Sequence, residues 1–272
     1  MNIKKLVRDL FAAYPRVDAL FRRVVWSRVH FPEIEMRFLH KLPPTIVDIA
    51  IDVGAAHGSY AWILNRKARR VYCFEPGEQH SAYLKAAVSG TRIELVEVAV
   101  GSNCSRVSMY TPGTDESALH SATLSTANPV IGFTDTRVRQ VDQVTLDDFF
   151  VNKIDTGRSV DIVKVDVEGY ELQVFEGAKA LLSRYYPLVF CEIEARHNAD
   201  YGRVFELLRG LGYSCFVYRD GSFKLFVDEH IEPIQSEADL KVRLSREYDP
   251  SNNRYINNFV FQHDRSRIKV NP

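Results

Sequence analysis

The chain has 272 residues, of which 46% are hydrophobic and 26% are charged, ordinary values for a folded domain with a substantial core. Thirty-five Lys and Arg residues balance thirty-five Asp and Glu residues, and this neutrality disfavours a nucleic-acid binder, which usually carries a basic excess. No stretch approaches the roughly 20 apolar residues that span a bilayer, and the first residues include no apolar run of signal-peptide type. The four cysteines form no CxxC pair, which favours a reducing compartment. We therefore expect a cytoplasmic protein without nucleic acid as a partner.

The first segment has helical periodicity. Apolar residues recur at spacings of three and four through residues 3–30, Lys and Arg punctuate them, and Pro15 divides the pattern into two helices. We expect residues 1–45 to form an N-terminal helical arm that packs on the main domain. The alternative is peripheral contact with the inner membrane surface, because a basic amphipathic helix can rest on anionic lipid.

From Ile46 onward, short apolar runs alternate with helical stretches, which is the pattern of a parallel sheet with right-handed crossovers. The expected strands are 46–53, 71–75, 93–100, 161–166, 188–194, 215–218 and 258–261. The expected helices are 60–67, 79–88, one that starts at Thr145, 172–183 and 204–211. We predict one α/β domain over residues 46–272.

An insertion at 101–145 interrupts this alternation. Residues 107–110 and 138–141 read as short strands, and a segment rich in Ser, Thr, Gly and Pro lies between them. A long ordered insertion in an α/β domain is usually a lid or a substrate loop, and the alternative is a disordered surface excursion.

A turn of small residues, Asp52-Val53-Gly54-Ala55-Ala56-His57-Gly58, follows the first strand and precedes a helix. Gly54, Ala56 and Gly58 permit a tight bend and a close approach by a ligand. The helix N-terminus behind them offers free N–H groups to a carboxylate or a phosphate. His57 either contacts the ligand or caps the helix.

Glu75 closes the second strand, about 20 residues after Gly54, the spacing at which an acid binds ribose hydroxyls in nucleotide folds. The loop departs from the G-x-G-x-x-G of dinucleotide sites because Ala56 occupies its second glycine position. Asp52 would repel a pyrophosphate but could hydrogen-bond an ammonium group, which S-adenosylmethionine (SAM) carries. The pattern therefore favours SAM over NAD.

At these residues the sequence resembles the FkbM family of class I SAM-dependent methyltransferases. The matching pieces are 52–58, Phe74-Glu75-Pro76, Ala99-Val100-Gly101, Val144-Thr145-Leu146-Asp147-Asp148, 164–171 (KVDVEGYE), Glu176-Gly177-Ala178 and Glu192. One departure is Ala56-His57, where the family commonly has Asn and an apolar residue.

The resemblance implies a Rossmann-like, seven-stranded, mostly parallel sheet with an antiparallel last strand. It implies SAM as the methyl donor and usually O-methylation of a sugar hydroxyl on a glycolipid, a polysaccharide or a secondary metabolite. The acceptor would be a small molecule or a glycan, and nothing in the sequence indicates an oligomeric state. The cofactor-binding set would be Asp52, Gly54, Ala55, Ala56, His57, Gly58, Glu75, Pro76, Ala99 and Val100.

Three residues are candidates for the chemistry. Asp166 ends the fourth strand and is the first choice for general base or substrate orientation, the alternative being a cap on the turn. Lys164 shares its strand face. Glu168 could bind acceptor hydroxyls, and His197 is an alternative base.

Asp166, Glu192, Glu194 and His197 could together hold a divalent cation, although no spacing demands one, and we expect catalysis without a metal. Two other functions remain open at this stage: a noncatalytic SAM-fold interaction module, and an NAD-dependent oxidoreductase.

Overall fold

The computed structural model describes residues 33–112, 122–124, 136–154, 157–198, 200–227, 230–243 and 254–270. The helices expected within 3–30 and most of the Ser/Thr-rich part of the insertion lie outside these ranges. In the part of the chain that is described, no helix has the length and apolar character needed to cross a membrane.

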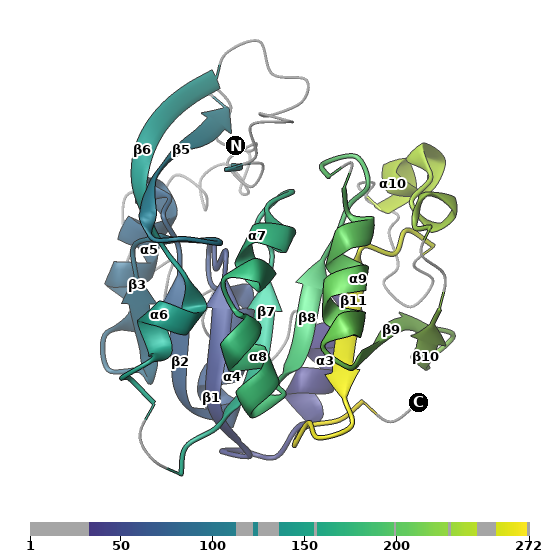
Figure 1. The fold of residues 1–272 in the computed structure, drawn as a ribbon, viewed down its shortest axis with the longest axis horizontal. Helices are drawn as coiled ribbons and strands as arrows, with labels where there is room; N and C mark the ends of the chain where they lie inside the picture. The colour runs from purple at the N-terminus through teal and green to yellow at the C-terminus, as the bar shows by residue number, and fades with distance from the viewer. Residues whose placement is uncertain are drawn as a thin grey trace, which may run out of the picture.

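An eight-stranded sheet forms the centre of the molecule, in the order β10-β9-β11-β8-β7-β1-β2-β3 (Figure 1). Its strands are β1 (Val47–Val53), β2 (Ala68–Phe74), β3 (Ile93–Val96), β7 (Val160–Val165), β8 (Leu188–Glu192), β9 (Tyr213–Arg219), β10 (Ser222–Phe226) and β11 (Asn258–His263). Strands β3, β2, β1, β7 and β8 are parallel neighbours, and β11 runs antiparallel to both β8 and β9. The predicted Rossmann-like sheet with an antiparallel last strand is confirmed.

β10 is the one sheet strand that the sequence analysis did not predict. It forms a hairpin with β9 through Asp220 and Gly221, whose φ angles of 52° and 81° place both residues in the left-handed region. Asp-Gly between two short apolar runs is a strong hairpin signal, so the sequence did contain the information.

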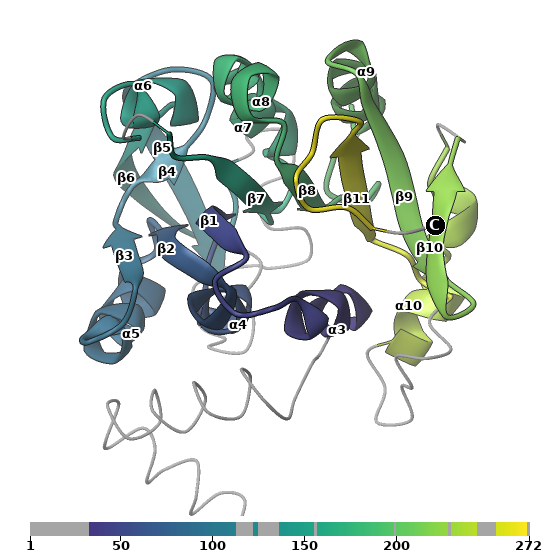
Figure 2. The ribbon, with the colours of Figure 1, turned by 90° about the horizontal axis from the view of Figure 1, so that it is seen from below.

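Helices cover both faces of the sheet (Figure 2). One layer holds α3 (Ile34–Lys41), α4 (Ser59–Lys67) and α5 (Glu78–Val88), and the other holds α6 (Leu146–Phe150), α7 (Glu171–Glu176), α8 (Lys179–Tyr185) and α9 (Gly202–Gly210). A 3₁₀ turn, η2 (Glu232–Ile234), and α10 (Glu237–Arg243) precede β11.

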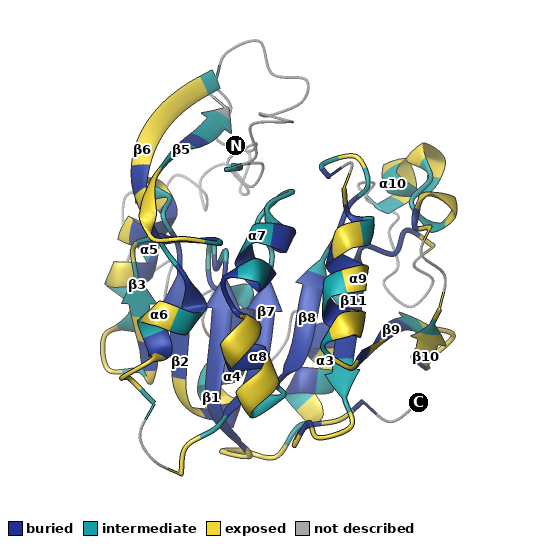
Figure 3. Ribbon diagram, viewed as in Figure 1, coloured by how far each residue is buried: buried dark blue, intermediate teal, exposed yellow. Residues whose placement is uncertain are grey.

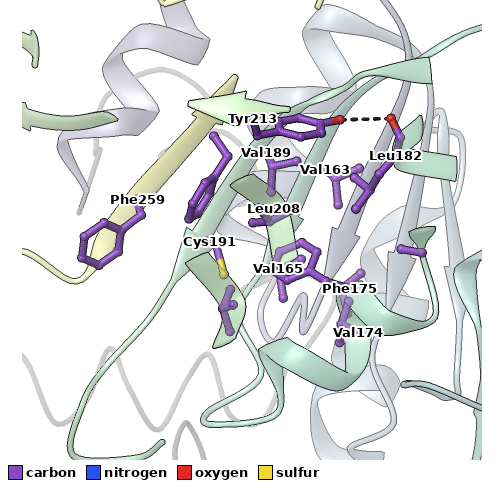
Figure 4. Close-up of a cluster of buried hydrophobic side chains, with 14 of the residues drawn as sticks. Val163, Val165, Val174, Phe175, Leu182, Val189, Cys191, Leu208, Tyr213 and Phe259 are labelled. Atoms are coloured by element: carbon purple, nitrogen blue, oxygen red, sulfur yellow. Dashed lines mark hydrogen bonds between the residues drawn. The ribbon is translucent and has the colours of Figure 1, made fainter. Parts of the chain in front are cut away.

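Two apolar cores lie between these layers and the sheet. The central strands are buried on both faces, whereas the outer sides of α8 and α9 are exposed (Figure 3). In the core beneath α7–α9, the Tyr213 hydroxyl donates to the carbonyl of Leu182 at 3.2 Å (Figure 4). On the other face, Met36 and Leu39 of α3 are fully buried, so the described part of residues 1–45 packs into the domain.

A second, three-stranded sheet stands above the edge of the first, beside α5 (Figure 1). It consists of β4 (Ala99–Val100), β6 (Thr136–Val144) and β5 (Ser105–Pro112), so the expected strand 93–100 is divided between two sheets. Both strands predicted inside the insertion are present, and they pair antiparallel.

Candidate active site

The carboxyl ends of four adjacent strands, β2, β1, β7 and β8, meet at one edge of the main sheet. Glu75, Gly54, Asp166 and Glu192 lie at these ends in that order. A cavity of about 290 Å³ opens there, near the lower end of the size range of small-molecule sites. Of the residues predicted for the site, those that line the cavity are Gly54, Ala56, Glu75, Pro76, Ala99, Val100, Asp166, Glu168 and Glu192.

Glu75 is held by backbone donors from two loops. One carboxylate oxygen accepts from the amide of Ala56 at 2.8 Å and the other from the amide of Gly77 at 2.7 Å. Ala56 has a φ of 44°, which is uncommon without a glycine. Burial raises the pKa of Glu75 to about 7, against the lowering effect of these amides. Each oxygen can accept a further hydrogen bond, and a carboxylate that lines the cavity is the group expected to bind the two hydroxyls of a ribose.

Gly54 brings the first loop against the end of β7. Its φ is +78°, and a Cβ at this position would lie 1.8 Å from the carbonyl oxygen of Asp166. The Asp166 amide donates to the carbonyl of Val53 at 3.0 Å. The floor of the cavity is therefore backbone, which suits a ligand that approaches closely.

Four members of the predicted cofactor set do not line the cavity: Asp52, Ala55, His57 and Gly58. Asp52 is 2% exposed and is the register partner of Lys164 on β7, while the next residue, Val53, lines the cavity. The His57 ring packs against His80 and Tyr83 of α5, at centroid distances of 4.6 and 5.3 Å. It does not cap α4, because the cap residue is Gly58 and no side chain bonds there.

Asp52 is nevertheless buried close to two other charged side chains, Lys164 and Asp166. One of its oxygens has no hydrogen-bond partner among the described residues. Burial raises the pKa of Asp52 to about 7, although the charge of Lys164 lowers it. The Lys164 ammonium is itself 3.4 Å from Asp166, which confirms that these two side chains share a face.

Glu168 and His197 form a pair at the opposite wall. The Nδ1 atom of His197 lies 2.5 Å from a Glu168 oxygen and 3.7 Å from Glu194. Burial raises the pKa of Glu168, while the hydrogen bond from His197 lowers it. Burial lowers the pKa of His197, but the bond and the charge of Glu168 outweigh it, so the net pKa is raised. Glu168 lines the cavity and His197 does not, which places His197 behind the carboxylate.

The backbone around Glu168 is strained and closely packed. Glu168 has a φ of 52°, costly for a residue with a side chain. A Cβ on Gly169 would lie 2.5 Å from the carbonyl oxygen of His197. Thr123 of the insertion donates from its hydroxyl to the Glu168 carbonyl at 2.7 Å. Strand β7, the insertion and the 194–198 turn together fix the position of this carboxylate.

The carboxylates considered as metal ligands have protein partners. The Asn257 amide donates to both Glu192 and Glu194, and Arg196 pairs with Glu194. The described residues include no group of three or more His, Cys, Asp or Glu side chains placed to hold a metal ion.

The lining residues that the sequence analysis did not name include Glu33 and Arg243. Glu33 precedes α3 and Arg243 ends α10. Neither follows a strand of the parallel sheet, so no spacing rule pointed to them. Met109 and Thr123 show that the insertion also contributes to the wall, as a substrate loop would.

The mostly parallel sheet, with a cavity at the carboxyl ends of its central strands, defines an α/β protein of the Rossmann-like methyltransferase class. Residues 52–215 match the family model described as the methyltransferase FkbM domain. The chain belongs to the FkbM methyltransferase family, and this membership implies SAM as its methyl donor.

Comparison with solved structures returns matches at low sequence identity, among them two methyltransferases. Methyltransferase FkbM from Methylobacillus flagellatus is 18% identical, with a TM-score of 0.45, over 79% of this chain and 43% of that one. This chain therefore spans less than half of that protein. An O-methyltransferase from Bacillus cereus, in complex with SAH, is 12% identical with a TM-score of 0.44, over 94% of this chain and 96% of that one. A comparison with curated proteins found no match.

Proposed function

We propose that this chain transfers the methyl group of SAM to a hydroxyl oxygen of a sugar, carried on a glycolipid, a polysaccharide or a secondary metabolite. The observation that carries the proposal is the Glu168 carboxyl, which lines the cavity and is bonded to His197. A sugar hydroxyl is a poor nucleophile while it keeps its proton, so a positioned base is what this acceptor requires.

When bound, SAM supplies a methyl carbon that its sulfonium charge already activates. With SAM bound, Glu168 would accept the proton of the acceptor hydroxyl as the methyl group passed from sulfur to oxygen and SAH was left. The raised pKa of Glu168 favours this role, because a carboxylate becomes a better proton acceptor as its pKa rises. His197 is a positioning residue that fixes the orientation of the carboxylate.

Asp166 was the first choice for the base from sequence, and we now propose Glu168 instead. The Asp166 carboxylate is already engaged by the buried Lys164 ammonium at 3.4 Å. Asp166 is better placed to orient the acceptor or the cofactor's amino-acid moiety. Membership of a methyltransferase family disfavours the NAD-dependent alternative, and a noncatalytic SAM-binding module remains the competing hypothesis.

The test uses the full chain, labelled SAM, and lipid and glycan extracts of cells. We expect label in a glycan or glycolipid fraction, on oxygen, with transfer by Glu168→Gln at least about 100-fold slower while its affinity for SAM is kept. Glu176→Gln, a carboxylate on α7 outside the cavity lining, is the matched control. Binding of SAM without transfer to any fraction would support the noncatalytic module, and label on nitrogen would refute O-methylation.

A further inference from the structure

We propose that Glu33, Glu192 and Arg243 form an acceptor subsite that takes a hydroxylated ring without negative charge and binds an amino-bearing ring best. This inference rests on the proposed function and goes beyond it by assigning the charge of the acceptor. Glu33 immediately precedes α3, Arg243 ends α10, and Glu192 comes from the end of β8.

The subsite is separated from the nucleoside end of the cavity. Glu75 follows β2 and Glu192 ends β8, with β1 and β7 between them. Strands lie about 4.8 Å apart, so roughly 14 Å of sheet edge separates the two carboxyls. Asp166 and Glu168 lie between the ends, where an acceptor would meet the methyl donor.

Carboxyl groups dominate this end. Glu33 accepts a hydrogen bond from the Tyr60 hydroxyl, and the Lys164 ammonium lies 4.9 Å from the centroid of the same Tyr60 ring. Burial would lower the pKa of Lys164, but the charges of Asp166, Glu33 and Glu192 outweigh it and raise the pKa. The charges of these three carboxyls therefore all act on one buried ammonium group.

Glu192 carries a carboxyl group on which the charges of neighbouring carboxyls act. Burial raises its pKa well above the usual range, and the charges of Asp166 and Glu33 raise it further. A positive group beside Glu192 would reverse this effect and stabilise its ionised form, whereas a carboxylate or phosphate would add to the repulsion.

Arg243 is the single Lys or Arg among the described lining residues, and its charge also acts on the buried Glu35. One arginine shared in this way leaves the subsite with more acceptors than donors. Hydroxyl and ammonium groups supply the donors that these carboxyls need. A hydroxylated ring satisfies them, and an amine adds a charge-assisted bond.

The test measures binding of three probes to the full chain saturated with SAH: the methyl glycosides of glucosamine, glucose and glucuronic acid. Calorimetry should give the tightest binding for the glucosaminide, and binding of the glucuronide at least about tenfold weaker than that of the glucoside, as expected where like charges meet. Added salt should reduce this discrimination. Glu33→Gln and Glu192→Gln should each reduce the difference in affinity between the glucoside and the glucuronide to about threefold or less. Glu206→Gln, exposed on α9, should leave this difference unchanged.

Glucuronide binding as tight as that of the other probes would overturn the inference, and so would failure of all three to bind. The outcome is separable from that of the proposed function. Label transferred to sugar oxygen without charge discrimination would refute the subsite alone, and charge discrimination without any methyl transfer would refute the transfer alone.

Discussion

Gly54 is required by the space around it. Its φ of +78° is strained for any side chain, and a Cβ would collide with the carbonyl of Asp166 at 1.8 Å. The contact joins the first loop to the end of β7, so a side chain here would separate the two halves of the cavity floor.

We therefore expect Gly54→Ala to weaken SAH binding at least about tenfold and to lower Tm. Gly90→Ala is the matched control, because Gly90 has a φ of +72° and a Cβ added there would have no neighbouring atom within 4 Å. Gly90→Ala should lower the free energy of unfolding only by the conformational cost of about 1–2 kcal/mol. Tm should fall by roughly 2–4 °C for each kcal/mol, and SAH affinity should be unchanged. Equal effects of the two substitutions on Tm and on affinity would contradict the packing argument.

Glu75 makes cofactor affinity depend on pH. Its pKa is about 7, so the carboxyl holds a proton below this pH and can accept fewer bonds from ribose. SAH affinity should rise roughly tenfold between pH 6 and pH 8 by linkage. Glu75→Gln should bind more weakly and lose most of the pH dependence, while Glu78→Gln, exposed on α5, should follow the wild type. A flat wild-type profile measured by calorimetry would count against a ribose-binding role.

The sequence located the strand-end residues of the site but could not orient all of them. Gly54, Glu75 and Asp166 were found because the carboxyl ends of parallel strands must meet at one edge. Asp52 does not line the cavity, because strand alternation tells which residues share a face and not which of them reach the cavity. Glu33 and Arg243 reach the cavity through tertiary packing, which no local pattern encodes.

At the scale of elements, several residues of the family-matching segments begin helices or hold them against one another. Thr145 caps α6 by accepting from the amide of Asp148, as the sequence predicted. Asp147 accepts from the amides of Ala180 and Leu181 at the start of α8. The predicted helix 172–183 divides at Gly177, where a Cβ would lie 2.0 Å from the carbonyl of Gly101. Close approach between remote segments decides this break, and periodicity within one segment could not predict it.

The insertion is joined to the proposed base by Thr123. Its backbone pairs with Tyr110 of β5 at 2.9 and 3.0 Å, and its hydroxyl donates to the Glu168 carbonyl at 2.7 Å. Thr123 therefore connects the second sheet to the 166–169 turn through hydrogen bonds.

Thr123→Val keeps the side-chain volume but removes this donor. We expect methyl transfer to fall about 5- to 20-fold, because a lost bond of about 1–1.5 kcal/mol loosens the turn, with SAH affinity unchanged. Thr111→Val, which removes a hydroxyl bonded to the Arg137 carbonyl within the β5–β6 pair, should have no effect on transfer. A steady-state assay of methyl transfer with both variants is the measurement. Equal rates for Thr123→Val and the wild type would show that the bond from Thr123 to the Glu168 carbonyl does not support transfer.

For the whole molecule, four buried carboxyl groups make the free energy of unfolding depend on pH. Burial raises the pKa of Glu35 to about 8 and those of Asp52, Glu75 and Glu171 to about 7. In the unfolded chain these groups titrate near pH 4. Between about pH 4 and the raised pKa values of the folded protein, the folded state binds more protons than the unfolded state. The free energy of unfolding therefore falls as pH rises.

We expect Tm of the ligand-free protein to decrease steadily from pH 5.5 to pH 8. Glu35→Gln removes one of these groups and should reduce the slope, because glutamine does not titrate. Calorimetric scans across this range provide the measurement. A Tm that increases toward pH 8 would show that the carboxyls are ionised in the folded protein.

The central claim is that the nucleoside of the methyl donor lies between Gly54 and Glu75, and a crystal structure of the protein with SAH measures this directly. We predict both ribose hydroxyls on the Glu75 carboxylate and the adenine against Val98, Ala99 and Val100. SAH bound elsewhere, or bound with its ribose away from Glu75, would contradict the account.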